Sequence, residues 1–214
     1  MGGLIPCKAC DLALRAAAPL LRNDLACFSI LGDGPERSRL EQLARSLNIE
    51  KAVSFYGWVS HAEVLRRLRS ADVMVFPSVR DFGAGVVFEA LATGVVPVVA
   101  DFGGPGDIVY PHVGFKVPLK NESDFVAQME RILMELAHNR DLLERLRRQG
   151  MAYARECLTW DAKAESTTRV LNWAVRRGPK PDLPPPKALA AGIVASREIA
   201  DTYAGNPVPG RSLF

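Results

Sequence analysis

The chain has 214 residues, of which 48% are hydrophobic and 24% charged, a globular composition large enough for one domain and a tail. Its net charge of +3 is too small to indicate a nucleic-acid partner, and basic residues alternate with acidic ones as on solvated helix faces. No apolar run reaches membrane-spanning length and no signal peptide is recognisable. We therefore expect a cytoplasmic protein, with a peripheral membrane association left open.

Apolar segments alternate with amphipathic ones along the first 176 residues. Strands are expected at 26–31, 53–56, 72–76, 95–100 and 113–117, and helices at 9–22, after Pro35, after Ser60, at 86–93, 122–137, 139–157 and 160–176, with a helical turn ending at Ile108. Ser60 and Glu63 have the spacing of a capping box. All-apolar strands that alternate with helices predict the α/β class, a doubly wound, Rossmann-like parallel sheet covered on both faces.

The composition changes after Arg177 to Gly-Pro-Lys-Pro-Asp-Leu-Pro-Pro-Pro. Such a stretch is typical of a polyproline linker. We therefore expect one folded domain over 1–177 and a Pro-rich, disordered tail over 178–214, in which a short helix at 188–200 stays open.

Cys7 and Cys10 form a lone C-x-x-C pair. No second pair and no nearby histidine completes a zinc site, and no strand precedes the pair as in a redox motif. We favour a coincidence over a redox role. Cys27 and Cys157 are expected to be buried as small apolar residues.

Residues 81–110 carry the strongest chemical signal. Two carboxylates, Asp81 and Glu89, flank one Gly-rich turn, and a second such turn follows at 103–106. Gly-rich turns at helix N-termini present backbone N–H groups that suit a phosphate. Carboxylates beside them can accept hydrogen bonds from sugar hydroxyls. This stretch could therefore hold both halves of a nucleotide-sugar.

The same stretch resembles the signature of family 4 retaining glycosyltransferases, which have the GT-B architecture of two domains. The matching residues are Asp81-Phe82-Gly83, Glu89-Ala90-Leu91-Ala92, Gly94 and Pro97-Val98-Val99-Ala100, and the resemblance reaches back to 30–35 and on to Trp160. The alternative is a generic Rossmann-like sheet whose glycines only form turns. Because four segments match in the right order, we favour the family resemblance.

The resemblance implies roles for individual residues. Asp81 and Glu89 match the acidic pair at the catalytic centre, where Glu89 binds the ribose and Asp81, shorter by one methylene than the usual Glu, touches the donor sugar. The implied donor-binding residues are Lys8, which meets the diphosphate, Gly83, Ala84, Gly85, Val86, Gly32, Gly34, Gly104 and Asp107. Gly3 stands where the family has a second cation, an arginine. The family needs neither a metal nor another cofactor.

Several of these residues also have plain structural interpretations. Lys8 could be an exposed surface lysine, and Glu89 could form a salt bridge to a neighbouring helix. Asp107 could be a charge at a helix start, and Gly32 and Gly34 could serve tight-turn geometry. Residues 55–58, Phe-Tyr-Gly-Trp, resemble the segment beside the base pocket in the family. The side chain of Trp58 could instead only pack against the protein.

The start of the chain departs from the expected fold. A doubly wound sheet has its first strand in the middle, between the second and the fourth. Here residues 2–8 match the segment that follows this strand in the family, and the strand itself is missing. We therefore expect a gap between residues 26–31 and residues 72–76, and residues 1–5 are too short to fill it. Because this gap would leave strand edges unpaired, we also expect the isolated chain to fold poorly.

The resemblance thus implies the C-terminal, donor-binding half of a GT-B glycosyltransferase. The reaction it implies is the transfer of a hexosyl group from a UDP- or GDP-sugar to the hydroxyl of a glycan, lipid or small-molecule acceptor, and we expect an N-terminal acceptor domain to complete the enzyme. A non-catalytic nucleotide-sugar-binding subunit and a nucleotide-sugar epimerase of the same architecture are the alternatives.

Overall fold

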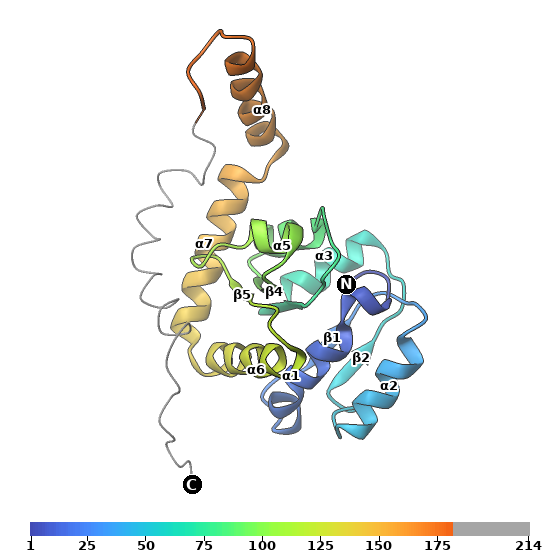
Figure 1. The fold of residues 1–214 in the computed structure, drawn as a ribbon. Helices are drawn as coiled ribbons and strands as arrows, with labels where there is room; N and C mark the ends of the chain where they lie inside the picture. Colours follow the sequence, from blue (N-terminus) through green and yellow to red (C-terminus); the bar gives the residue numbers. More distant parts are fainter. Residues whose placement is uncertain (182–214) are drawn as a thin grey trace. The chain divides into compact units, whose positions relative to one another are not determined.

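The computed structural model describes residues 1–181 and divides the chain into two compact units, Met1–Leu158 and a second that begins at Thr159 (Figure 1). The strands are β1 (Phe28–Ile30), β2 (Val53–Phe55), β3 (Val73–Phe76), β4 (Val96–Ala100) and β5 (Phe115–Val117). The helices of the first unit are η1 (Pro6–Lys8), α1 (Cys10–Arg22), α2 (Arg37–Ser46), α3 (His61–Arg69), α4 (Gly85–Ala92), α5 (Gly103–Ile108), α6 (Glu122–His138) and α7 (Arg140–Cys157). The described part of the second unit contains α8 (Trp160–Ala174).

The strands form two parallel sheets, β1–β2 and β3–β4–β5. Phe28 lies opposite Val53 in the first sheet, and Val73 opposite Val96 in the second. All five residues of β4 are buried, which agrees with its unbroken apolar sequence and its place between two other strands. The alternation of parallel strands with helices confirms the predicted α/β class.

Apolar faces of the helices cover these strands. Leu14, Ala16 and Leu21 are buried on α1, which packs against α6, while α4 packs against α7. Among the described residues, no helix is both long enough and apolar enough to cross a membrane. A cytoplasmic location stays a prediction.

Side-chain caps fix where several helices begin. The Ser60 hydroxyl accepts a hydrogen bond from the Glu63 amide at 3.3 Å, as the predicted capping box requires. The Glu63 carboxylate, however, bonds arginines of its own helix instead of reaching back to the cap. Asn121 and Asn139 cap α6 and α7 in the same way as Ser60.

The strands are shorter than the sequence predicts. β1 and β5 each begin two residues later than expected, and α2 begins at Arg37 rather than next to Pro35. Cys27 precedes β1 and is exposed, so its predicted burial is wrong, because the strand starts only after it. Most of the predicted tail, from residue 182 onward, lies outside the described residues, and the predicted boundary at 177 stays a prediction.

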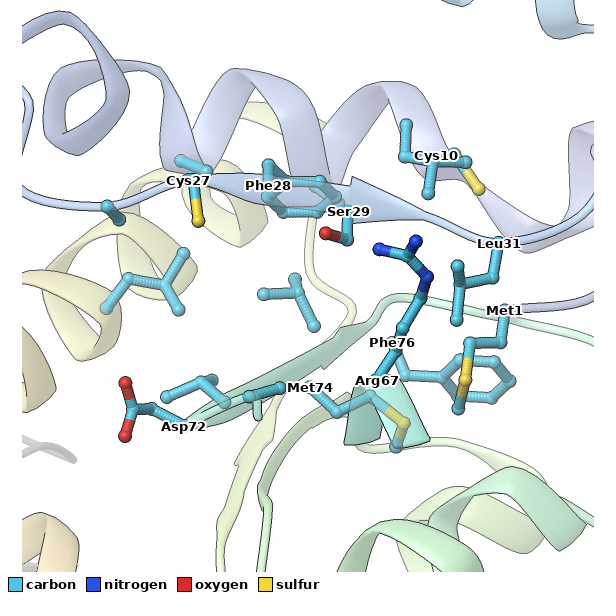
Figure 2. Close-up of a pocket in the computed structure, with 18 of the residues that line it drawn as sticks. Met1, Cys10, Cys27, Phe28, Ser29, Leu31, Arg67, Asp72, Met74 and Phe76 are labelled. Atoms are coloured by element: carbon cyan, nitrogen blue, oxygen red, sulfur yellow. The ribbon is translucent and has the colours of Figure 1, made fainter. Parts of the chain in front are cut away.

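The expected gap lies between β1 and β3, which belong to different sheets. A cavity of about 550 Å³ separates them, with residues of the β1 segment along one side and residues of β3 along the other (Figure 2). Residues 2–4 run beside the end of β1: the Gly2 amide donates to the Leu31 carbonyl, and the Leu4 amide to the Asp33 carbonyl, both at 2.9 Å. These residues therefore extend only past the carboxyl end of β1 and leave the rest of the gap open.

Candidate functional site

The loops at the carboxyl ends of the strands, together with the helices that follow them, carry most of the residues that the sequence singles out. Residues 31–34 follow β1, residues 77–84 join β3 to α4, and residues 101–102 join β4 to α5. Because parallel strands end at the same edge, these loops form one rim, the usual ligand-binding position in open α/β sheets.

The loop before α4 leaves the N-terminus of that helix open. Ala84 has a left-handed backbone conformation (φ 39°), and no side chain among the described residues caps the helix. A Cβ built on Gly83 or Gly85 would meet no described atom within 4 Å. The Gly85 and Val86 amides at this N-terminus can therefore be approached by a ligand, and the helix dipole favours an anion.

Lys8 and Asp81 form an ion pair between η1 and the loop after β3. The Ser78 hydroxyl donates to the Asp81 carboxylate at 3.3 Å, and the Lys8 ammonium lies 5.3 Å from the centre of the Phe76 ring. The Lys8 and Asp81 side chains are only 21% and 19% exposed. The sequence assigned both to one site, and the structure brings them together, but it also shows that each already neutralises the other.

Glu89 lies on α4 and pairs with His61, the first residue of α3. The His61 Nε2 atom lies 3.0 Å from a Glu89 carboxylate oxygen, and the Glu89 side chain is 32% exposed. The salt bridge to a neighbouring helix is therefore present. One third of the carboxyl side chain nevertheless stays accessible to a ligand hydroxyl.

Three of the assigned glycines are required by the packing of the chain itself. A Cβ on Gly32 would lie 1.8 Å from the Gly2 carbonyl oxygen, and one on Gly34 would lie 2.5 Å from the Leu4 carbonyl oxygen. A Cβ on Gly104 would lie 2.1 Å from the carbonyl oxygen of Phe82. Gly104 thus lets the loops after β3 and β4 touch, whereas Gly32 and Gly34 admit the N-terminal residues.

Asp107 lies in the second half of α5, so the interpretation as a charge at a helix start is wrong. The segment 103–106, predicted as a Gly-rich turn, forms the first part of this six-residue helix, and Asp107 is exposed near its end. Its assigned role toward the donor sugar stays a prediction.

Aromatic and basic side chains lie beside the loop after β2. The Arg67 guanidinium lies 3.4 Å from the centre of the Tyr56 ring, and hydrogen bonds from Ser54 and Arg67 lower the pKa of the Tyr56 hydroxyl. Hydrogen bonds from Arg66 lower the pKa of Glu63 to about 2, with Arg67 contributing. Trp58 is 72% exposed and does not pack, so its ring is available for stacking.

Sequence reasoning missed two contacts of this rim. In the sequence His61 is an isolated histidine, yet its ring contacts the Glu89 carboxylate. The Ser78 hydroxyl donates a hydrogen bond to the Asp81 carboxylate. Only the position of His61, directly after the Ser60 cap, hints that it begins a helix near the site. Among the described residues, no group of three or more potential ligands is arranged to hold a metal ion.

Comparison with known proteins gives a consistent family match. The model of the family described as "Glycosyl transferases group 1" matches residues 1–151. An uncharacterized glycosyltransferase of Methanocaldococcus jannaschii is 29% identical over 82% of the chain, and a D-inositol 3-phosphate glycosyltransferase of Streptomyces bingchenggensis is 32% identical over 82%. The chain spans only 44% and 40% of these relatives.

Solved structures show the same fold. The pneumococcal O-GlcNAc transferase GtfA, solved with UDP and GlcNAc, has a TM-score of 0.66 and 19% identity, over 80% of this chain and 35% of that one. The C-terminal domain of a group 1 glycosyl transferase (LpcC) from Francisella tularensis has a TM-score of 0.62 and 21% identity, over 71% of this chain and 80% of that domain. The architecture is therefore Rossmann-like, as in one half of a GT-B glycosyltransferase.

Proposed function

The chain belongs to the group 1 glycosyl transferases, and on that premise we propose that it is the donor-binding half of a retaining hexosyltransferase of family 4. The donor is a UDP- or GDP-sugar, and the acceptor is a hydroxyl of a glycan, lipid or small molecule. One observation carries this proposal: the open N-terminus of α4 lies on the same rim as Lys8, Asp81 and Glu89.

The diphosphate is bound at the start of α4. A Cβ built on Gly83 or Gly85 has no described atom within 4 Å, and no acidic residue lies in the first turn of this helix to repel an anion. Lys8 adds a full positive charge once a phosphate competes with Asp81 for its ammonium group. Fixed donors of this kind also stabilise the negative charge that develops on the leaving nucleotide.

The two carboxylates then serve the two sugars of the donor. Glu89 accepts hydrogen bonds from the ribose hydroxyls, with His61 holding its carboxylate in place. Asp81, freed from Lys8, contacts the transferred hexose. Because Asp is one methylene shorter than the Glu usual at this position, its reach favours a hexose hydroxyl that lies close to the loop.

Transfer of the sugar also requires a surface that binds the acceptor, opposite the donor site. Residues 1–181 supply the donor side, and the relatives are more than twice as long as the segment that this chain matches. We therefore propose that an N-terminal acceptor-binding domain completes the enzyme. The family assignment disfavours the epimerase alternative, whereas Gly3, in place of a second cation, favours a non-catalytic donor-binding subunit as the second candidate.

Calorimetry with UDP and with GDP tests the donor site. We expect one of the two nucleotides to bind with and without a chelator, and the variants Lys8→Ala and Glu89→Gln to bind it roughly tenfold or more weakly, since each loses a charged hydrogen bond of about 1.5–3 kcal/mol.

Lys51→Ala and Glu50→Gln are the matched controls, because both side chains are exposed and both residues precede β2, at the end of the strand opposite the rim. Absence of heat from both nucleotides, or equal weakening by the control variants, would refute the donor assignment. Transfer of labelled hexose by this chain alone would refute the need for a separate acceptor-binding domain.

A further inference from the structure

The ion pair between Lys8 and Asp81 joins two residues that the proposed function assigns to different parts of the donor. Lys8 lies in η1 and is assigned to the diphosphate, whereas Asp81 lies in the loop after β3 and is assigned to the transferred hexose. In the structure the Lys8 ammonium group bonds the Asp81 carboxylate, and both side chains are partly buried. Each group therefore occupies the position that a ligand group would take beside the other.

The backbone around Asp81 is held on two sides. The Val79 amide donates to the Cys7 carbonyl at 3.1 Å, which links the loop after β3 to η1. The Gly104 amide donates to the Asp81 carbonyl at 3.0 Å, which links the same loop to α5. Because the loop is held at both places, the ion pair opens by rotation of its side chains and not by a movement of the loop.

Asp81 has few other hydrogen-bond donors when Lys8 turns away. Among the described residues, its other side-chain partner is the Ser78 hydroxyl at 3.3 Å. Ser78 is fully buried, and its hydroxyl also lies 3.4 Å from the Cys7 carbonyl oxygen. One hydroxyl has a single proton to donate, so Ser78 cannot replace the ammonium group. A partly buried carboxylate without its cation is unfavourable unless a ligand supplies new donors.

Lys8 has a single acidic partner within the described residues, and this partner is Asp81. The Phe76 ring, 5.3 Å from the ammonium group, offers it only a cation–π contact. A diphosphate at the start of α4 therefore competes with the Asp81 carboxylate for one cation.

A free nucleotide and an intact donor differ in what they offer Asp81. Both carry a diphosphate, so both can draw the Lys8 ammonium group away from the Asp81 carboxylate. Only the intact donor also carries a hexose, whose hydroxyls can donate hydrogen bonds to the released carboxylate. The free nucleotide leaves this carboxylate with the Ser78 hydroxyl alone. The free nucleotide is also the product that must dissociate after transfer.

We propose that Asp81 is a specificity-determining residue that makes the site discriminate between the intact nucleotide-sugar and the free nucleotide, because Asp81 competes with the diphosphate for Lys8. This role rests on the proposed function and deepens it, since the carboxylate that contacts the hexose also weakens binding of the nucleotide alone. Once the hexose has been transferred, Asp81 pairs with Lys8 again and the nucleotide dissociates faster.

Calorimetry on the full chain carrying Asp81→Asn tests the proposal. Asparagine keeps the shape of the side chain but removes its charge, so Lys8 becomes available to the diphosphate. We expect the nucleotide that the wild type binds, UDP or GDP, to bind this variant roughly fivefold or more tightly. Among the donors UDP-glucose, UDP-N-acetylglucosamine and GDP-mannose, we expect at least one to gain clearly less than its nucleotide, because it loses the contact between its hexose and the carboxylate.

Two controls separate competition for Lys8 from a general loss of negative charge. Asp101→Asn removes a carboxylate of the neighbouring loop after β4, where Asp101 pairs with Lys116 at 3.2 Å. This variant should change nucleotide affinity by less than about twofold, because solvent and salt screen a charge that does not contact the ligand. In a Lys8→Met background, Asp81→Asn should lose most of its effect, because no ammonium group is left to compete for.

Thermal melts give a second measurement, since Asp81→Asn leaves the Lys8 charge without its partner and should lower the melting temperature of the unliganded chain. Saturating nucleotide should then raise the melting temperature of this variant by more than it raises that of the wild type.

Three outcomes overturn the proposal: an unchanged or weaker nucleotide affinity in Asp81→Asn, an equal gain for the nucleotide and all three donors, or a full effect of Asp81→Asn in the Lys8→Met background. Absence of nucleotide binding to the wild type is a different result, because it refutes the donor site itself and this role with it.

Discussion

Substitution of Gly83 by Val separates ligand binding from stability at the start of α4. A Cβ at this position meets no described atom within 4 Å, and the residue is exposed. The folded protein should therefore tolerate the larger side chain within about 0.5 kcal/mol. A diphosphate that approaches the amides of Gly85 and Val86 would instead meet the added methyl groups.

The expected loss follows from the contacts that the added side chain would block. One charged hydrogen bond contributes about 1.5–3 kcal/mol, which corresponds to a roughly 10- to 140-fold weaker nucleotide affinity. Calorimetry with UDP and GDP measures this loss, and a thermal melt checks that the melting temperature stays within about 2 °C of the wild type. An unchanged affinity in a stable Gly83→Val variant would refute the placement of the diphosphate at this helix.

Three further predictions concern the surrounding structure. Gly104→Ala would place a Cβ 2.1 Å from the Phe82 carbonyl oxygen, so we expect the unfolding free energy to decrease by about 1–3 kcal/mol. An unchanged melting curve would contradict this close contact. His61→Ala releases Glu89 and should weaken nucleotide binding by roughly two- to fivefold, the equivalent of about 0.5–1 kcal/mol; calorimetry showing equal affinity would remove His61 from the site. His112 is buried, with neither ring nitrogen hydrogen-bonded among the described residues, so His112→Phe should stabilise the fold by about 1–3 kcal/mol. Burial lowers the pKa of His112 below 6.5, so as the pH falls the imidazole is protonated in the unfolded state before it is protonated in the folded state. The melting temperature of the wild type should therefore decrease below about pH 6.5. The Phe variant should not show this decrease.

The fold was largely predictable because its signals are local. The unbroken apolar run at 95–100 predicts a buried central strand, and β4 is buried throughout. The Ser60 cap predicts the start of α3, which begins at His61. Strand ends were less predictable, since the neighbouring strand determines where pairing stops, and β1 therefore covers only Phe28–Ile30.

The sequence predicts that the candidate residues come together at one edge of the sheet, but not how their side chains pair. Strand and helix order places the loops at one edge, so the sequence could bring Lys8, Asp81 and Glu89 to the same rim. Which charge pairs with which depends on tertiary distances: Lys8 meets Asp81 across 73 positions, and His61 meets Glu89 across 28. The unsatisfied ring of His112 is likewise invisible in the sequence, because burial of that position is set by α7 and the loop after α5.

Amide exchange at the start of α4 during titration with UDP and GDP tests the donor site most directly. The account predicts slower exchange at the Gly83, Gly85 and Val86 amides with one of these nucleotides, without added metal. The Asp124 amide near the start of α6, already bonded to the Asn121 side chain, should stay unchanged. Binding that leaves the α4 amides unprotected, or no binding of either nucleotide, would contradict the account.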